Sequence, residues 1–164
     1  MAATWEDRRK LMRDYFDELQ MIEGKPLLSD RQQDTLFARH VKEVQDGYGA
    51  WIDINCEDEL VGFLIVVQAP NCHPDADYFV EQAYVKPSHR GQGVMSSVLD
   101  SFVQENAGIY CLFILKENVK AKKFWDDAFA GAGYVPCFLR DVGAAYAGIE
   151  QYGYAKSVVP LRPC

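Results

Sequence analysis

The stretch AYVKPSHRGQGVMSSVL, residues 83–99, decides how this chain folds. An apolar strand ends, two glycines flank Gln92, and apolar residues at helical spacing follow. A glycine turn between a strand and a helix directs several backbone N–H groups one way, at the positive end of the helix dipole. Because Gly91 and Gly93 lack Cβ, an anion can approach the backbone closely, and Arg90 adds a fixed positive charge. The stretch therefore predicts a phosphate or diphosphate site.

Two familiar glycine motifs do not match this turn. A P-loop would need the pattern GxxxxGK[ST], which the sequence lacks. A dinucleotide fingerprint would need a third glycine at position 96, where Ser96 stands. Taken alone, Arg-Gly-Gln-Gly is equally compatible with an ordinary strand-to-helix turn, so that alternative stays open at this point.

Outward from this turn, the hydrophobic pattern predicts the element order α-α-β-β-β-α-β-α-β-β, an α/β fold. Thr4 with Asp7, and Ser29 with Gln32, have the spacing of capping boxes at the starts of two helices. The apolar face of the second helix includes His40. The helices are expected over residues 4–22, 29–44, 93–107 and 118–133, and the strands over residues 50–55, 60–68, 78–87, 109–116, 134–142 and 152–160. The two strands around the central helix are expected to be parallel.

Composition limits the possible functions. The 164 residues suit one domain, 1–164, and 49% of them are hydrophobic, enough for a sizeable core. The sequence contains no apolar run of about 20 residues, and its start lacks the apolar core of a secretory signal, so no membrane association is expected. Five cysteines without a CxxC pair suggest reduced thiols and a cytoplasmic protein. A net charge of −7 argues against nucleic-acid binding and mildly favours a cationic small partner, although solubility explains it more simply.

Two motifs resemble those of a known family. The pattern Val85-x-Pro87-x-x-Arg90-Gly91-x-Gly93-Val94 resembles the acetyl-CoA-binding motif of the GNAT superfamily of N-acetyltransferases, with Met95 where Gly or Ala is usual. The pattern Asn118-x-x-Ala121-x-x-Phe124-Trp125, followed by Gly133-Tyr134, is similar to a second GNAT signature. The resemblance implies a mixed central sheet of six to seven strands flanked by four helices. Because the first helix begins near residue 5, the first strand of the family is apparently missing, and a homodimer could cover the sheet edge.

The resemblance also implies direct transfer of an acetyl group from acetyl-CoA to a primary amine, with no metal. The backbone of residues 83–85 would pair with the pantetheine arm, and the glycine turn would bind the diphosphate. The coenzyme site would thus comprise Ala83, Tyr84, Val85, Arg90, Gly91, Gln92, Gly93, Val94, Met95, Asn118, Lys122 and Phe124. A β-bulge in the strand before the turn would free backbone groups to face the thioester carbonyl.

Glu81 is the candidate general base. It lies four residues before Val85, and strand parity predicts that both side chains share one face. In GNAT acetyltransferases of spermidine and spermine, a glutamate at this place is a proposed base. A solvated strand carboxylate with no catalytic role is the alternative.

The general acid is a departure from the family pattern. Trp125 stands where the family usually has a tyrosine, and an indole N–H cannot release a proton at useful pH. The thiolate could leave unaided, or the acid could be Tyr134, Tyr84, Cys111 or a water. Met95 either points into the helix packing or alters the coenzyme site.

The acceptor amine is left open. A polyamine, an aminoglycoside or a lysine side chain would each fit loops at residues 23–30 and 141–153, where Tyr146, Glu150 and Tyr152 could form an aromatic and acidic cleft. Two alternatives remain: a catalytically weakened acyl-CoA-binding module for regulation or interaction, and an enzyme that uses a longer acyl donor.

Overall fold

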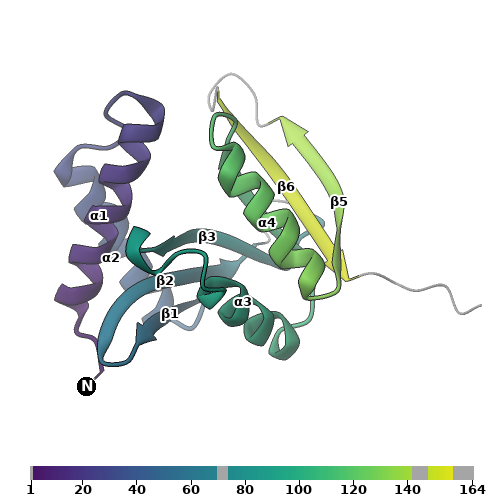
Figure 1. Ribbon diagram of the computed structural model, residues 1–164, viewed down its shortest axis with the longest axis horizontal. Helices are drawn as coiled ribbons and strands as arrows, with labels where there is room; N and C mark the ends of the chain where they lie inside the picture. Colours follow the sequence, from purple (N-terminus) through teal and green to yellow (C-terminus); the bar gives the residue numbers. More distant parts are fainter. Residues whose placement is uncertain (1, 70–73, 142–147, 157–164) are drawn as a thin grey trace, which may run out of the picture.

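The computed structural model describes residues 2–69, 74–141 and 148–156 (Figure 1). The elements follow the expected order: α1 (Trp5–Glu23), α2 (Asp30–Gln45), β1 (Gly49–Cys56), β2 (Glu59–Gln68), β3 (Tyr78–Val85), the short 3-10 helix η1 (Pro87–His89), α3 (Val94–Glu105), β4 (Tyr110–Leu115), α4 (Val119–Gly131), β5 (Tyr134–Asp141) and β6 (Ile149–Lys156). The last strand begins three residues earlier than expected, and its predicted end beyond residue 156 lies outside the described residues.

Both predicted capping boxes are confirmed. The Thr4 hydroxyl accepts from the Asp7 N–H at 3.2 Å, and the Asp7 carboxylate accepts from the Thr4 N–H at 2.9 Å. Ser29 and Gln32 exchange the corresponding bonds at the start of α2. Each box satisfies N–H groups that the helix itself leaves without partners.

One mixed sheet with the strand order β1-β2-β3-β4-β6-β5 forms the centre of the fold. Among the described strands only β3 and β4 pair in parallel; they lie before and after α3 in the chain, as expected for the central strand–helix–strand unit. The described residues form a sheet of six strands and four α-helices. Two helices precede the first strand of the sheet, which agrees with the predicted absence of the first strand of the family.

The helices cover the sheet on two faces (Figure 1). On one face α1 and α2 pack against the β1–β3 half, where Phe63, Ile65 and Tyr84 meet Leu11 and Phe16. The other face carries the larger cluster, formed with α3 and α4; its most central side chains include Leu64, Leu99, Leu112, Phe129 and Tyr154. Each helix pair has an apolar side that must be buried. The sheet lies between the two pairs and covers the apolar side of each. No helix among the described residues is long and apolar enough to cross a membrane.

The two central strands separate soon after they begin to pair. Residues 78–80 of β3 pair with residues 110–112 of β4, and beyond that point β3 pairs with β2 alone and β4 with β6 alone. Residues 81–85 of β3 and 113–115 of β4 therefore face each other across an opening that no described strand fills. Backbone N–H and C=O groups on such edges need partners from outside the sheet, which makes this opening suitable for an extended ligand.

Candidate active site

Glu81 lies at the point where the central strands diverge. Ile65 is opposite Gln82 and Val66 is opposite Val80, so Glu81 is an extra residue in β3 without a partner in β2. A β-bulge in this strand was suggested only by way of the family resemblance, as a device that would free backbone groups for the thioester. Bulges occur where a strand must redirect one side chain or stop pairing, and this bulge does both one residue after the last β3–β4 pair.

The bulge overturns the prediction that Glu81 and Val85 share a face. Val85 packs in the cluster formed with α3 and α4, whereas the Glu81 carboxylate contacts α2 on the opposite face. The parity rule assumes a regular strand, and one inserted residue shifts the alternation by one position. Glu81 therefore faces the same side of the sheet as Tyr84.

Three residues of α2 surround the Glu81 carboxylate. Arg39 forms an ion pair with Oε1, and Nδ1 of His40 lies 3.3 Å from Oε2. The same His40 nitrogen is 3.1 Å from Oε2 of Glu43. Glu81 is 10% exposed, and its Oε2 accepts no hydrogen bond from the residues that the structure describes. Arg39 thus neutralises one oxygen of Glu81, while the other is buried beside His40 without a hydrogen bond from the described residues.

Arg39 and Glu43 are neighbours of Glu81 that the sequence did not predict. Nothing local marks them, because α2 and β3 are about 40 residues apart in the chain and only the tertiary fold brings them together. His40 carried a usable signal, since it occupies the apolar face of its helix. Nδ1 of His40 and one carboxylate oxygen each of Glu43 and Glu81 lie within 4.8 Å of one another, a spacing that would suit a bound cation. Arg39, however, already supplies Glu81 with a positive charge.

His40 makes the stability of the protein depend on pH. Its side chain is fully buried, and desolvation together with the nearby Arg39 lowers the pKa of the imidazole to about 3. Because the unfolded chain binds this proton near pH 6.5, the stabilising effect of a neutral His40 is complete above that pH. It is lost as the pH falls from about 6.5 toward 3, at no more than roughly 1.4 kcal/mol per pH unit.

We expect a steeper loss of stability between pH 6.5 and 4.5 in the wild type than in His40→Gln, which cannot titrate. Urea unfolding at pH 7.5, 6.0, 5.0 and 4.5 measures the two slopes. Glu43, whose pKa is raised by burial, titrates in both proteins. Equal slopes in the two proteins would contradict the buried neutral imidazole.

The glycine turn has the geometry of an anion cradle. Gly91 and Gly93 have φ values of 74° and 75°, in the left-handed region that favours glycine. A Cβ built on either residue would meet no other atom within 4 Å, so both project toward open space. Gly93 is also the N-cap of α3, where no side chain in the described part of the chain caps the first N–H groups. These amides are free to bind an anion.

Arg90 departs from its expected role. Its Nη1 and Nη2 donate to the two oxygens of Glu18, both at 2.6 Å, and its Nε donates to the Val85 carbonyl at 2.7 Å. All three donor nitrogens are thus used within the protein. In this structure Glu18 binds the guanidinium fork and the Val85 carbonyl accepts from Arg90, so a role of Arg90 toward a phosphate stays a prediction.

Met95 points away from the turn. It is buried in the cluster between α3, α4 and the sheet, which decides between the two alternatives for this departure from the family pattern. Val94 is partly buried in the same cluster, as is Ala83 of β3. Gln92 is exposed, and its side chain donates to the Ser88 carbonyl at 3.4 Å. The backbone, more than the side chains, therefore faces the open space at this turn.

The second motif lies at the start of α4. Asn118 is the N-cap, and its side-chain oxygen accepts from the Ala121 N–H at 3.1 Å. Lys122 pairs with Asp126, and its ammonium lies 4.5 Å from the centre of the Tyr152 ring. Phe124 is partly buried and lines a groove of about 480 Å³ between α3 and α4. The groove begins close to the glycine turn, at Ser96 and Ser97.

The three protein side chains proposed to replace the family tyrosine are all buried. Trp125 is 8% exposed and packs against Phe124 and Phe129 in the core, as its helical spacing indicated. Tyr134 is buried beside Phe129, and Cys111 is buried in the part of β4 that still pairs with β3. Tyr84 packs toward α1, next to Tyr15, and burial raises the pKa of its phenol.

Glu150 and Tyr152 do meet, as the predicted acceptor cleft requires. The Tyr152 hydroxyl donates to the Glu150 carboxylate, and burial together with this bond raises the pKa of Tyr152 to about 12. Both residues are on β6, beside the part of β4 where β4 separates from β3. Tyr146 falls outside the described residues.

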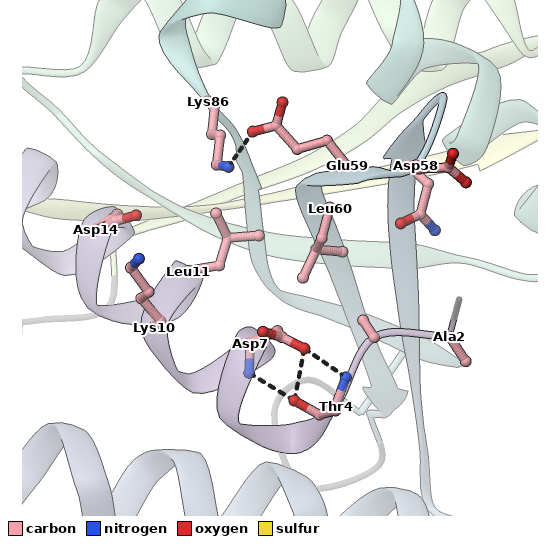
Figure 2. Close-up of a pocket in the computed structure, with 12 residues that line it drawn as sticks. Ala2, Thr4, Asp7, Lys10, Leu11, Asp14, Asp58, Glu59, Leu60 and Lys86 are labelled. Carbon is pink, nitrogen blue, oxygen red and sulfur yellow. Dashed lines mark hydrogen bonds and ion pairs between the residues drawn. The ribbon is translucent and has the colours of Figure 1, made fainter.

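A separate groove of about 360 Å³ lies between the start of α1 and the β1–β2 hairpin (Figure 2). Figure 2 shows Lys86 pointing toward Glu59 at its upper edge and the Thr4–Asp7 capping box at its lower edge. The lining includes Asp14 and Asp58 but none of the residues at the opening between β3 and β4. Of its carboxylates, Asp7 belongs to the helix cap, Glu59 pairs with Lys86, and Asp14 and Asp58 are on the surface. This groove is therefore distinct from the candidate active site.

The family follows from a comparison with protein-family models. Residues 5–129 match the model of the acetyltransferase (GNAT) family, a span that includes the bulge, the glycine turn and most of α4. The chain belongs to the GNAT acetyltransferase family. This GNAT acetyltransferase matches no curated protein in a sequence search.

Solved structures share its fold. An acetyltransferase from Thermus thermophilus is 18% identical over 92% of both chains, with a TM-score of 0.64. A ribosomal-protein-alanine N-acetyltransferase from Brucella melitensis is 16% identical over 94% of this chain and 96% of its own, with a TM-score of 0.64. The microcin C7 self-immunity acetyltransferase, solved with acetyl-CoA and AMP, is 11% identical over 94% of this chain and 87% of its own, with a TM-score of 0.62.

Acetyl-CoA is the acetyl donor of this family, and the geometry of this GNAT acetyltransferase fits it. The diphosphate requires converging amides with space in front of them, and the Gly91–Gly93 turn has both. The pantetheine arm requires an unpaired strand edge, and the β3–β4 opening has one that starts beside the bulge. The two features are joined by the few residues of η1.

Proposed function

We propose that this GNAT acetyltransferase acetylates a primary amine of a small cationic molecule, of polyamine or aminoglycoside type, with Glu81 as the general base. The observation that carries the proposal is the bulge, which puts a carboxylate with one unbonded oxygen where the coenzyme-binding strands separate. The net charge of −7 favours a cationic acceptor over an anionic one. A lysine side chain of a protein is the other acceptor of the same chemistry.

The residues have distinct tasks in this scheme. The glycine-turn amides hold the diphosphate, and the open edge of residues 81–85 orients the arm that carries the thioester. Freed N–H groups beside the bulge stabilise negative charge on the carbonyl oxygen as it develops. When acetyl-CoA is bound, its thioester supplies the acyl group.

Glu81 removes the proton that the amine must lose. An alkyl ammonium group with a pKa near ~10 is about three units away from its neutral form at pH 7, a deficit of roughly 4 kcal/mol. The amine nitrogen bonds to the carbonyl carbon, the carbon–sulfur bond breaks, and the sulfur takes the electron pair. The proton moves from nitrogen to Oε2 of Glu81, directly or through a water. A thiolate with a pKa near ~8.5 can leave without a protein acid, which agrees with the core position of Trp125.

A thiol-release assay tests the proposal. We expect turnover of acetyl-CoA with spermidine or kanamycin to exceed turnover with a lysine-containing peptide by about tenfold or more in kcat/KM, because the acidic protein attracts polycations. Raising the salt concentration should narrow that gap. A preference for the peptide would contradict the small-molecule acceptor. Tight CoA binding without turnover on any amine would instead favour the acyl-CoA-binding module, and faster release from propionyl-CoA or succinyl-CoA would favour a longer acyl donor.

A further inference from the structure

Arg90 links three parts of the molecule that meet at the glycine turn. Its Nε holds the carbonyl of Val85, the last residue of β3, and its two terminal nitrogens hold the carboxylate of Glu18 on α1. The guanidinium also lies 5.5 Å from the centre of the Tyr84 ring. A planar fork bound at three nitrogens has one orientation, so the backbone of Arg90 is held in place as well.

The ion pair with Glu18 is strong for a partly exposed contact. It is bidentate, with both bonds at 2.6 Å, and the two side chains are 43% and 30% exposed. Glu18 raises the pKa of Arg90 further, mainly through the hydrogen bonds. Two-point Arg–carboxylate pairs hold geometry better than ordinary surface ion pairs do, because both hydrogen bonds must break before either side chain can rotate.

We propose that Glu18 is a positioning residue for the coenzyme: through Arg90 it holds the glycine turn in the conformation that binds the diphosphate. Gly91 follows Arg90 directly, and the conformational freedom of two glycines would otherwise let the amides point in different directions. α1 supplies the rigid support, since Leu11 and Phe16 anchor it in the core. Glu18 touches no reacting atom in this scheme.

The inference rests on the assignment of the turn as the diphosphate site, and it opposes a simple alternative. If Arg90 served the phosphate directly, Glu18 would compete with the coenzyme for the guanidinium. Removing Glu18 would then strengthen coenzyme binding. If Glu18 positions the turn, its removal weakens binding. The two mechanisms predict changes of opposite sign.

The test compares Glu18→Gln with Asp17→Asn, which removes the same charge from the neighbouring exposed position of α1. We expect Glu18→Gln to raise the KM for acetyl-CoA and the Kd for CoA by about tenfold, the loss expected for one charge-assisted contact. The kcat and the KM for the acceptor should change less than twofold, because Glu18 contacts neither the amine nor the thioester. Asp17→Asn should change none of these constants.

Three results would overturn the inference. They are an unchanged coenzyme affinity in Glu18→Gln, a tighter affinity, and an equal weakening in Asp17→Asn. If Glu18→Gln lowers the melting temperature but leaves the affinity for CoA unchanged, the inference is also overturned. Gly93→Val, measured in parallel, separates this failure from a failure of the site assignment: if it too leaves CoA affinity intact, the turn is not the diphosphate site at all.

Discussion

Glu81→Gln is expected to lower kcat/KM for the acceptor amine by about 10²–10³-fold at pH 7, the usual contribution of a positioned general base. Glutamine keeps the size of the side chain and can still accept a hydrogen bond from Arg39, but it cannot take a proton. The loss should appear in kcat/KM for the amine and leave CoA affinity within twofold, since the carboxylate faces α2 and not the glycine turn.

The pH profile gives this experiment a second readout. The wild type has a base and should be active near neutral pH, whereas the variant should gain activity only as the free amine accumulates toward pH ~10. The difference between the two enzymes should therefore shrink at high pH. A parallel assay with a fully deprotonated acceptor, such as an aromatic amine, should show a much smaller effect of the substitution.

Glu43→Gln is the matched control. Glu43 belongs to the same cluster and contacts the same His40 nitrogen, but it is on α2 instead of the bulged strand and is more exposed, at 26%. We expect at most a threefold loss of kcat/KM. If the two substitutions have equal effects, the cluster as a whole sets activity and Glu81 is not the base. If Glu81→Gln loses less than threefold, the amine loses its proton elsewhere.

Gly93→Val is expected to abolish measurable CoA binding, with a rise in Kd of about 100-fold or more. Two effects combine. A β-branched residue at a φ of 75° is strained by about 1–2 kcal/mol or more, so the turn is driven toward another conformation. If the turn keeps its shape, the valine side chain fills the open space in front of the amides, where the diphosphate must lie.

Gly47→Val controls for the strain alone. Gly47 has a φ of 78°, and a Cβ on it would also meet nothing within 4 Å, but it lies between α2 and β1. Both variants should lose similar thermal stability, while only Gly93→Val should lose CoA binding in calorimetry. Retained binding in Gly93→Val, or equal loss in both variants, would contradict the diphosphate site at this turn.

Local sequence patterns predicted most of the secondary structure because the causes are local. The side chains of Thr4 and Ser29 cap their helices by accepting from backbone N–H groups three residues later. The run at residues 60–68 is apolar because that strand is covered on both faces. The glycine turn was also readable, since a left-handed backbone at Gly91 and Gly93 needs glycine in the sequence itself. The order of the elements then left few topologies for the sheet.

The sequence by itself determined the family, the elements and the glycine turn; the tertiary structure decided which groups those elements place together. A single inserted residue at Glu81 reversed the face that parity had predicted, because a bulge depends on pairing with β2 and leaves no local signature. Arg90 was expected to bind phosphate, and Glu18, 72 positions earlier, occupies it. The contacts of Arg39 and His40 with Glu81 likewise join residues far apart in the chain. Such contacts depend on how α1 and α2 pack across the sheet, and charge partners far apart in the chain follow only from that packing.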